Sequence, residues 1–177
     1  LSAPVSIQRD AQGVVTIDAA NETDMARVLG FVHAQERYFE MDLLRRSASG
    51  ELSALFGKIA VEKDKSIRVH RLRARIRQNY AHMAGSEAAV LQAYADGVNA
   101  GLKALSARPW PYLLLNAKPE AWKPEDSFLV GFAMFFDLQD EDNEREYKLW
   151  QLKNLLPAPI FAMLTQTRSA WDAPLFG

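Results

Sequence analysis

The chain has 177 residues, 49% of them hydrophobic, which is enough to bury the core of one domain. Its formal net charge is −1 and the charges are well mixed, which argues against a nucleic-acid surface, since phosphate binding needs clustered lysine and arginine. Cysteine is absent, which excludes disulfides, a thiol nucleophile and cysteine-based metal sites. No apolar run is long enough to span a bilayer, so we expect no membrane insertion.

The first 20 residues have the pattern of a β-hairpin. Residues 5–8 and 14–18 alternate apolar and polar side chains. The turn-forming sequence RDAQG lies between them at residues 9–13. We therefore predict two short antiparallel strands.

A long amphipathic helix is predicted next, with Thr23 as its N-cap and Asp24 in its first turn. Its apolar residues recur at spacings of three and four, and Gly50 interrupts it before a short second helix that ends at Gly57. This helix carries many charged groups for one with so much apolar surface. We therefore expect it to be covered on more than one side, with its charges paired.

Five polar residues of this helix are interpreted as structural. We expect His33 to be a hydrogen-bonded side chain without a catalytic role. We expect the others to form a network of ion pairs that fixes the helix against a partner chain, namely Arg37, Asp42, Arg45 and Arg46.

The middle of the chain predicts more helices. Residues 63–77 contain seven lysines and arginines, which indicate either an exposed helix face with ion pairs or, as the alternative, an anion site. Ser86 is predicted to cap a helix that extends to about residue 105. Asn99, inside that helix, is expected to bind a backbone carbonyl or a partner chain.

The last predicted helices differ in character. Residues 128–138 are almost wholly apolar and must be buried or line a pocket, whereas residues 144–156 form a more polar helix that prolines end. The three histidines lack zinc-site spacing, and neither a G-x-S-x-G elbow nor a phosphate-binding glycine loop is present. The residues alone therefore reveal no convincing active site.

One long motif identifies a family resemblance. Residues 30–57 follow the pattern G-[YF]-x-x-A-Q-[DE]-R-x-[FW]-Q-M-[DE]-x-x-R-R-x-x-x-G-x-[LV]-[SA]-x-x-[FL]-G, with matches at Gly30, Phe31, Ala34, Gln35, Glu36, Arg37, Phe39, Met41, Asp42, Arg45, Arg46, Gly50, Glu51, Leu52 and Gly57. The chain thus resembles the α chain of the penicillin acylase family of N-terminal-nucleophile hydrolases. Shorter matches include D-x-x-x-R (Asp64, Arg68), Y-A-x-G-x-N-A (residues 94–100) and W-x-P-x-D (Trp122, Pro124, Asp126).

The resemblance implies an α+β fold class. The chain would be the mostly helical α chain of a heterodimeric, four-layer αββα N-terminal-nucleophile hydrolase, and its N-terminal β-hairpin would join the shared core. We expect a single domain over residues 1–177, with the hairpin in residues 1–20 and helices in residues 24–156. Residues 157–177 would be a C-terminal tail, either a removable spacer or part of the mature chain.

The resemblance also implies the chemistry. In this family a precursor cuts itself at a Gly-Ser bond, and the new N-terminal Ser of the β chain is the nucleophile. We therefore expect no catalytic residue in this chain, an obligate β chain as partner and Gly177 as the processing site. The substrate would be a small acyl-amide, either a penicillin or an N-acyl-homoserine lactone, and the protein would be periplasmic or secreted.

Two sites are predicted by the resemblance. Met134, Phe135 and Leu138 would shape the acyl pocket, although such an apolar stripe is more often core. A structural Ca²⁺ shared with the β chain would use Glu146, with Glu144 as the alternative ligand and a surface ion pair as the simpler interpretation. The rival to all of these predictions is a self-contained helical interaction domain without catalysis.

Overall fold

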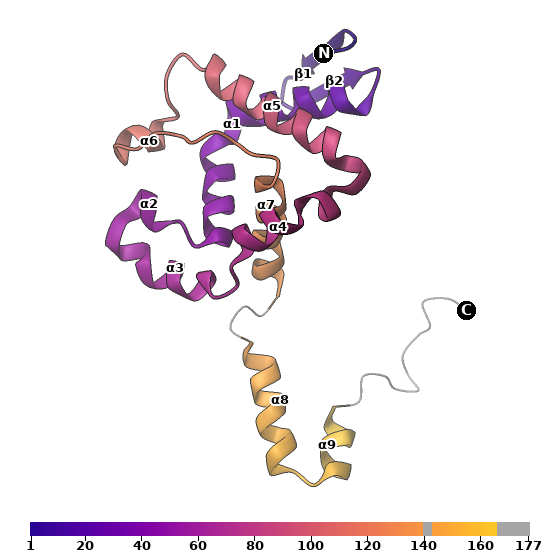
Figure 1. Cartoon of the computed structure of the whole chain (residues 1–177), viewed down its shortest axis with the longest axis vertical. Coiled ribbons are helices and arrows are strands. Elements are labelled where there is room, and N and C mark those ends of the chain that lie inside the picture. The colour runs from indigo at the N-terminus through magenta and orange to yellow at the C-terminus, as the bar shows by residue number, and fades with distance from the viewer. Residues whose placement is uncertain (140–142, 166–177) are drawn as a thin grey trace, which may run out of the picture. The chain divides into compact units, whose positions relative to one another are not determined.

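The computed structural model describes residues 1–139 and 143–165, and the chain there is mostly helical with one two-stranded antiparallel sheet (Figure 1). The mostly helical fold with an N-terminal hairpin is thereby confirmed. The chain divides into two compact units, residues 1–135 and 136–177. The elements in order are β1 (Val5–Arg9), β2 (Val15–Ala19), α1 (Glu22–Ser49), α2 (Ser53–Phe56), η1 (Gly57–Ala60), α3 (Val61–Arg68), α4 (Leu72–Ala84), η2 (Gly85–Glu87), α5 (Ala88–Ala104), α6 (Trp110–Leu114), α7 (Asp126–Leu138), α8 (Glu144–Leu155) and α9 (Ala158–Leu164).

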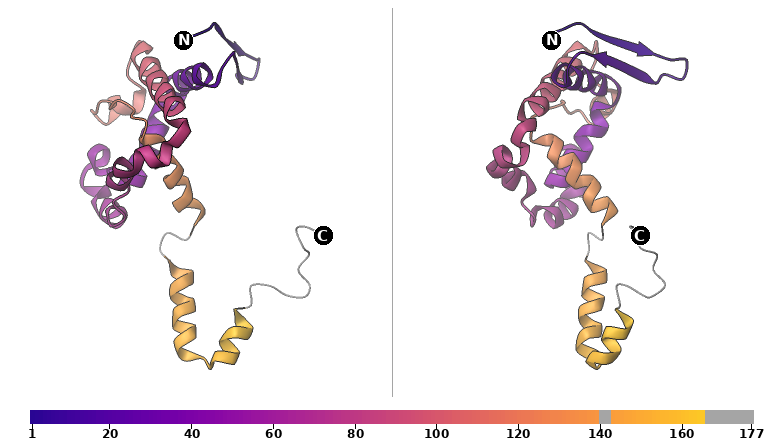
Figure 2. Two further views of the ribbon diagram at one scale, coloured as in Figure 1. Left: turned by 45° about the vertical axis from the view of Figure 1, so that its right-hand side comes forward. Right: turned by 90° about the vertical axis from the view of Figure 1, so that its right-hand side faces the viewer.

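The hairpin pairs β1 with β2 so that Ile7 lies opposite Ile17. Its turn is closed by the Asp10 carboxylate, which accepts hydrogen bonds from the backbone N–H groups of Gln12 and Val14 at 3.0 and 2.8 Å. Figure 2 shows the hairpin beside the first turns of α1. The predicted strands are thus present.

Helix α1 begins earlier than predicted, and Thr23 is not its N-cap. The cap is Asn21, whose side-chain oxygen accepts from the Asp24 N–H at 2.8 Å. The buried Asp24 carboxylate in turn accepts from the Ser2 hydroxyl, the Ser2 N–H and the Ala3 N–H. Hydrogen bonds from Ser2 and Asn21 lower the pKa of Asp24 well below its ordinary value. The start of α1 therefore holds the N-terminal segment in place.

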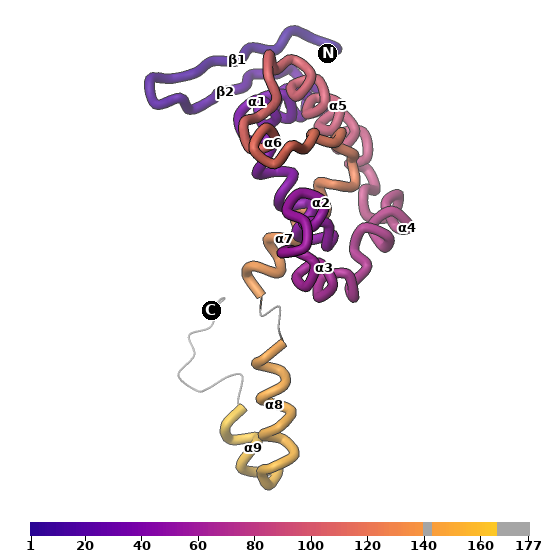
Figure 3. The backbone as a smooth tube through the Cα atoms, turned by 90° about the vertical axis from the view of Figure 1, so that its left-hand side faces the viewer, coloured from indigo at the N-terminus to yellow at the C-terminus, as the bar shows by residue number. Residues whose placement is uncertain are grey.

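Helix α1 is interrupted at Arg37, where the backbone leaves helical angles (φ −145°, ψ 29°), and it ends at Gly50. Gly50 has φ +66°, the left-handed conformation that glycine adopts without strain. A Cβ at this position would also lie 2.7 Å from the Asp64 carbonyl oxygen. The predicted break at Gly50 is confirmed, and α2, η1 and α3 follow it. Figure 3 shows α2 and α3 after the end of α1.

Helices α1 and α5 of the first unit cross closely at three glycines. A Cβ added to Gly97 would lie 1.8 Å from the Arg27 carbonyl oxygen, and one added to Gly30 or Gly101 would lie 2.3 Å from a carbonyl oxygen of the other helix. No side chain fits between the two backbones at these points. The glycines therefore set the distance between α1 and α5.

Two apolar clusters form the core of the first unit. The larger one lies between α1, α5 and α6 and includes the fully buried Tyr38, Val98 and Tyr112. The smaller one packs Ala48 of α1 and Ile76 of α4 against Leu129 of α7. Together the clusters place the start of α7 next to the C-terminal half of α1.

The second unit is described by itself. In α8 the rings of Tyr147 and Trp150 stack, with centroids 6.0 Å apart, and both side chains are exposed. Helix α9 lies in the predicted tail, whose residues 166–177 lie outside the described part of the chain. Within residues 1–139 and 143–165, no helix is both long and apolar enough to cross a membrane.

We predict that Gly97→Ala destabilises the protein by about 1–3 kcal/mol or more, because the methyl group would force the two backbones apart. Gly131→Ala is the matched control, since a Cβ at Gly131 would meet no atom within 4 Å. The control should be neutral or stabilising by up to about 1 kcal/mol, because alanine is the better helix former. Denaturant unfolding of the full-length protein measures both, and equal effects would contradict the prediction.

Candidate functional site

Helix α7 has one packed face and one exposed face. Asp126 and Leu129 are buried, and Phe128, Phe132 and Ala133 pack partly against the smaller cluster. The predicted substrate-binding residues lie instead on the surface, where Met134 is 59%, Phe135 54% and Leu138 71% exposed. They are therefore not core residues of the described chain, and their contact with an acyl group stays a prediction.

The predicted metal ligand is also exposed. Glu146 lies in α8, with one carboxylate oxygen 3.8 Å from Arg145, and Glu144 forms a 2.6 Å ion pair with Lys148. No group of three or more histidine, aspartate or glutamate side chains that could hold a metal occurs in the described part of the chain. Calcium takes six to eight oxygen ligands, so Glu146 could contribute only one part of such a site. The predicted processing site, Gly177, lies outside the described residues.

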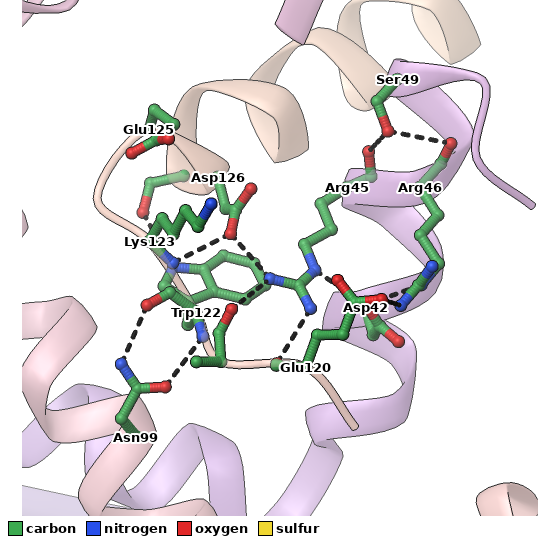
Figure 4. Close-up of polar contacts among 12 residues, drawn as sticks. Asp42, Arg45, Arg46, Ser49, Asn99, Glu120, Trp122, Lys123, Glu125 and Asp126 are labelled. Atoms are coloured by element: carbon green, nitrogen blue, oxygen red, sulfur yellow. Dashed lines mark hydrogen bonds and ion pairs between the residues drawn. The ribbon is translucent and has the colours of Figure 1, made fainter. Parts of the chain in front are cut away.

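The most constrained polar cluster surrounds Arg45 (Figure 4). Arg45 is 3% exposed, and its guanidinium bridges Asp42, at 2.7 Å from Nε, and Asp126, at 2.6 Å from Nη1. It also donates to the backbone carbonyls of Glu120 and Ala121, each at 3.0 Å. A fifth, longer hydrogen bond runs from Nη2 to the Tyr38 hydroxyl oxygen at 3.3 Å, so that all five donors of this guanidinium are directed at oxygen atoms, as a buried charge requires.

The neighbours of Arg45 are satisfied as well. Arg46 donates to Asp42 at 3.0 Å, and the Tyr112 hydroxyl donates to the other Asp42 oxygen at 2.6 Å. The Trp122 ring lies against the Arg45 guanidinium, 5.0 Å from ring centroid to Cζ, a cation–π contact. Among residues 1–139 and 143–165, no buried side-chain nitrogen or oxygen lacks a hydrogen-bond partner.

The electrostatics keep this cluster ionised. Burial opposes the charge of Arg45, but Tyr38 and the carboxylates of Asp42 and Asp126 together outweigh that effect and raise the pKa of Arg45. Burial also opposes the charge of Asp126 and by itself would raise the pKa of this carboxyl. Arg45, the Lys123 N–H and Arg73 together lower that pKa below its ordinary value. Arg45 and Asp126 therefore stay charged near neutral pH, which suits a structural ion pair better than proton transfer in catalysis.

Further contacts link the Arg45 cluster to the basic residues 63–77. Arg73 of α4 binds Asp126 at 2.8 Å and both carboxylate oxygens of Glu51 at 2.7 Å. Arg68 donates to the Gly50 carbonyl at 2.7 Å. Ion pairs therefore account for Arg73, and a hydrogen bond accounts for Nε of Arg68, as the ion-pair alternative for residues 63–77 expects.

These contacts surround a cavity of about 350 Å³ in the first unit. Its lining contains six cationic side chains, namely Arg45, Arg46, Arg68, Arg73, Arg77 and Lys123, and three carboxylates, namely Glu51, Glu120 and Asp126. The remaining lining residues are Ser53, Ala54 and Ala121. The cavity is therefore polar and unsuited to an apolar acyl chain.

The predictions for His33 and Arg37 of α1 have different outcomes. His33 is hydrogen-bonded as expected, with Nδ1 3.0 Å from the Tyr94 hydroxyl, and its burial and the nearby Arg37 lower its pKa. Arg37 was wrongly placed in the ion-pair network, because it is half exposed and lies near Glu36. The partners of Arg45 and Arg46 in the network belong to this chain. The network therefore fixes α1 to other segments of the same chain, at Glu120 and Asp126.

The sequence interpretation missed several members of the cluster. Glu51, Arg73 and Tyr112 were not assigned roles, although Glu51 matches the motif that follows the glycine. Asn99 binds the Trp122 backbone at both its oxygen and its nitrogen, each at 2.8 Å, which confirms the backbone alternative. Trp122 and Asp126 also belong to the cluster, and the short W-x-P-x-D motif that contains them was the signal in the sequence that could have indicated it.

Comparison with known proteins gives a consistent result. Residues 4–171 match the family model of penicillin amidase. The chain is 42% identical to "Penicillin acylase 2 proenzyme" of Pseudomonas sp. (strain SE83) over 73% of its length, which is 17% of that protein. It is 35% identical to "Acyl-homoserine lactone acylase QuiP" of Pseudomonas aeruginosa over 80% of its length, again 17% of that protein.

A solved structure has the same fold. The thermostable penicillin G acylase from Alcaligenes faecalis superposes with a TM-score of 0.71 and 24% identity, covering 97% of this chain and 95% of that chain. The chain therefore spans under a fifth of the length of the curated relatives it matches, but nearly all of one chain of this structure. The resemblance inferred from the motifs is confirmed.

We predict that Arg45→Ala destabilises the protein by about 3–5 kcal/mol, because it leaves Asp42 and Asp126 buried without their shared partner. Loss of soluble, folded full-length protein should result. Arg37→Ala, on the same helix but exposed, should change stability by less than about 0.5 kcal/mol. Soluble yield and thermal unfolding measure both, and an Arg45→Ala protein that unfolds at the unsubstituted temperature would refute this role.

Proposed function

The chain belongs to the penicillin amidase family, and on that basis we propose that it is the α subunit of an amide-bond acylase. The enzyme would remove an acyl side chain from an amine-bearing core, as in a penicillin or an N-acyl-homoserine lactone. It would act only together with a β chain from the same precursor, in the periplasm or outside the cell. The names of the relatives support both substrate types, and one of them is called a proenzyme.

The proposed chemistry takes place on the β chain. The oxygen of its N-terminal Ser attacks the amide carbonyl, and its own α-amine, acting through water, accepts the proton. The C–N bond breaks as the amine leaves with a proton, and an acyl-enzyme remains. Water then attacks the ester and releases the acid and the free Ser. The α chain would contribute binding surface and support.

The exposed face of α7 is the observation that carries this proposal. Met134 and Leu138 are four residues apart, so they lie on one face of the helix, and Phe135 is adjacent. All three are more than half exposed, although large apolar side chains cost free energy in water. We propose that they line the acyl pocket. Helix α7 carries no lysine or arginine, which disfavours a charged acyl group.

Two measurements on the full-length protein test the proposal. Intact mass and N-terminal sequencing should reveal a second, larger chain that begins with Ser. A panel of linear and aromatic acyl-amides should then be hydrolysed by the pair. Full-length protein that stays a single uncut chain and hydrolyses no acyl-amide would favour the rival, a helical interaction domain.

Substitutions on α7 should change acyl specificity. We predict that Met134→Ala and Phe135→Ala each lower kcat/KM for the preferred acyl chain by about tenfold or more and change the order of preference across the panel. Met83→Ala and Phe56→Ala are matched controls, because Met83 and Phe56 are also exposed but lie outside α7. Equal losses in the controls, or an unchanged order of preference, would argue against a pocket on α7.

We also propose that Glu146 supplies one ligand to a Ca²⁺ ion shared with the β chain. Its carboxylate is exposed, and its only ion pair within the described part of the chain, with Arg145, is long at 3.8 Å. Glu144 is the alternative, although Lys148 already neutralises it. Bound Ca²⁺ would serve as a structural cross-link between the chains.

Calcium-dependent unfolding tests this assignment without an activity assay. We predict that added Ca²⁺ raises the Tm of the full-length protein, that Glu146→Gln removes most of the rise and that Glu144→Gln retains it. Loss of the rise in Glu144→Gln alone would transfer the ligand role to Glu144. No rise in the unsubstituted protein would eliminate the site.

A further inference from the structure

We propose that the polar cavity beside the Arg45 cluster binds a small oxyanion with two or more negative charges, of the phosphate or polycarboxylate kind. The proposal is independent of amide hydrolysis, since none of the three apolar residues proposed for the acyl pocket lines this cavity. Asp126 does line it, and Met134 lies about 12 Å further along α7, given a rise of 1.5 Å per residue.

The inner wall of the cavity is electrically balanced. Arg45, Arg46 and Arg73 are the cations there, and they are matched by Asp42, Asp126 and Glu51 through contacts of 2.6–3.0 Å. These six charges satisfy one another, so the wall itself neither attracts nor repels an anion strongly. Any net field in the cavity must come from the other lining residues.

Those other residues are mainly cationic. Arg68 uses Nε on the Gly50 carbonyl, and its terminal nitrogens make no hydrogen bond or ion pair with the described residues. Nor does any contact of this kind tie the Lys123 ammonium to them, and no dashed line ends at it in Figure 4. Arg77 has only a 3.3 Å contact with Glu125 and is half exposed. Three cations with unused donors thus surround one cavity.

Three acidic groups partly offset this charge. Arg68 helps to lower the pKa of the buried Asp64 carboxylate, so Asp64 attracts Arg68. Glu120, which lines the cavity, is 72% exposed and 3.2 Å from Arg46, and Glu125 shares Arg77. Neither Glu120 nor Glu125 lies within ion-pair distance of Lys123 or Arg68 in the described residues. Guanidinium groups bind phosphate and carboxylate in bidentate fashion, and an ammonium adds a further donor. A compact oxyanion would therefore complete hydrogen bonds that these side chains leave open.

The size and chemistry of the cavity limit the ligand. A volume of about 350 Å³ is at the lower end of the range for small-molecule sites, and its lining has no large apolar side chain. The cationic side chains come from α3 (Arg68), α4 (Arg77) and the segment before α7 (Lys123). An anion held by all three would link segments that are far apart in the sequence. It should stabilise the folded protein by mass action.

Thermal unfolding of the full-length protein tests the site, with inorganic phosphate as the probe and sodium chloride at the same pH and ionic strength as the reference. We expect a saturable rise in Tm with phosphate. Citrate, compared at equal ionic strength, distinguishes a polycarboxylate from a tetrahedral anion, and a saturable rise with either supports the site. No such rise with phosphate or citrate would overturn it.

Two charge-removing variants and two controls locate the effect. Arg77→Gln and Lys123→Gln should each weaken the apparent affinity for the anion about three- to tenfold, and both sites are exposed enough that folding should survive. Arg75→Gln, on α4, and Lys118→Gln, before α7, remove the same charge from residues outside the cavity lining and should leave the affinity unchanged. Equal weakening in variants and controls would show a general charge effect and refute the site.

Discussion

The buried bridge from Asp42 through Arg45 to Asp126 is the interaction on which the rest of the first unit depends. Each of these charges would be very costly to bury alone, and the cost is offset only when all partners are present. Arg45 and Asp126 are 81 positions apart in the sequence, so the bridge forms only when the start of α7 reaches α1. The buried charges thus favour this packing of α7 on α1 over alternative packings in which a charge would lose its partner.

The glycine crossing between α1 and α5 supports this bridge through a short chain of contacts. The crossing sets where α5 lies, and α5 carries Asn99, which holds the backbone of Trp122 by two hydrogen bonds. The Trp122 ring then packs against the guanidinium of Arg45. A displacement of α5 by the width of a methyl group would therefore disturb the ion pairs of Arg45 on α1, because close-packed interiors transmit such shifts.

The sequence predicted those parts of the fold that local patterns determine. The hairpin, the break at Gly50 and the pairing of Arg45 with Asp42 follow from alternation, glycine conformation and helical spacing. The exact start of α1 and of α5 did not, because Asn21 and Thr23 are both good caps, and a short 3₁₀ turn that contains Ser86 precedes Ala88. Contacts between distant segments, such as Arg73 with Asp126, have no local signature in one sequence.

The same reasoning separates the residues that identify the family from those that would choose a substrate. Asp42, Arg45 and Asp126 belong to the family motifs, and in this structure they bind one another. Met134 and Phe135 take no part in this bridge, and their side chains are exposed. A chain can therefore keep the buried bridge, and with it this part of the fold, while the exposed face of α7 changes. Acyl preference should vary between relatives that share this buried cluster, because different side chains of one helix serve stability and recognition.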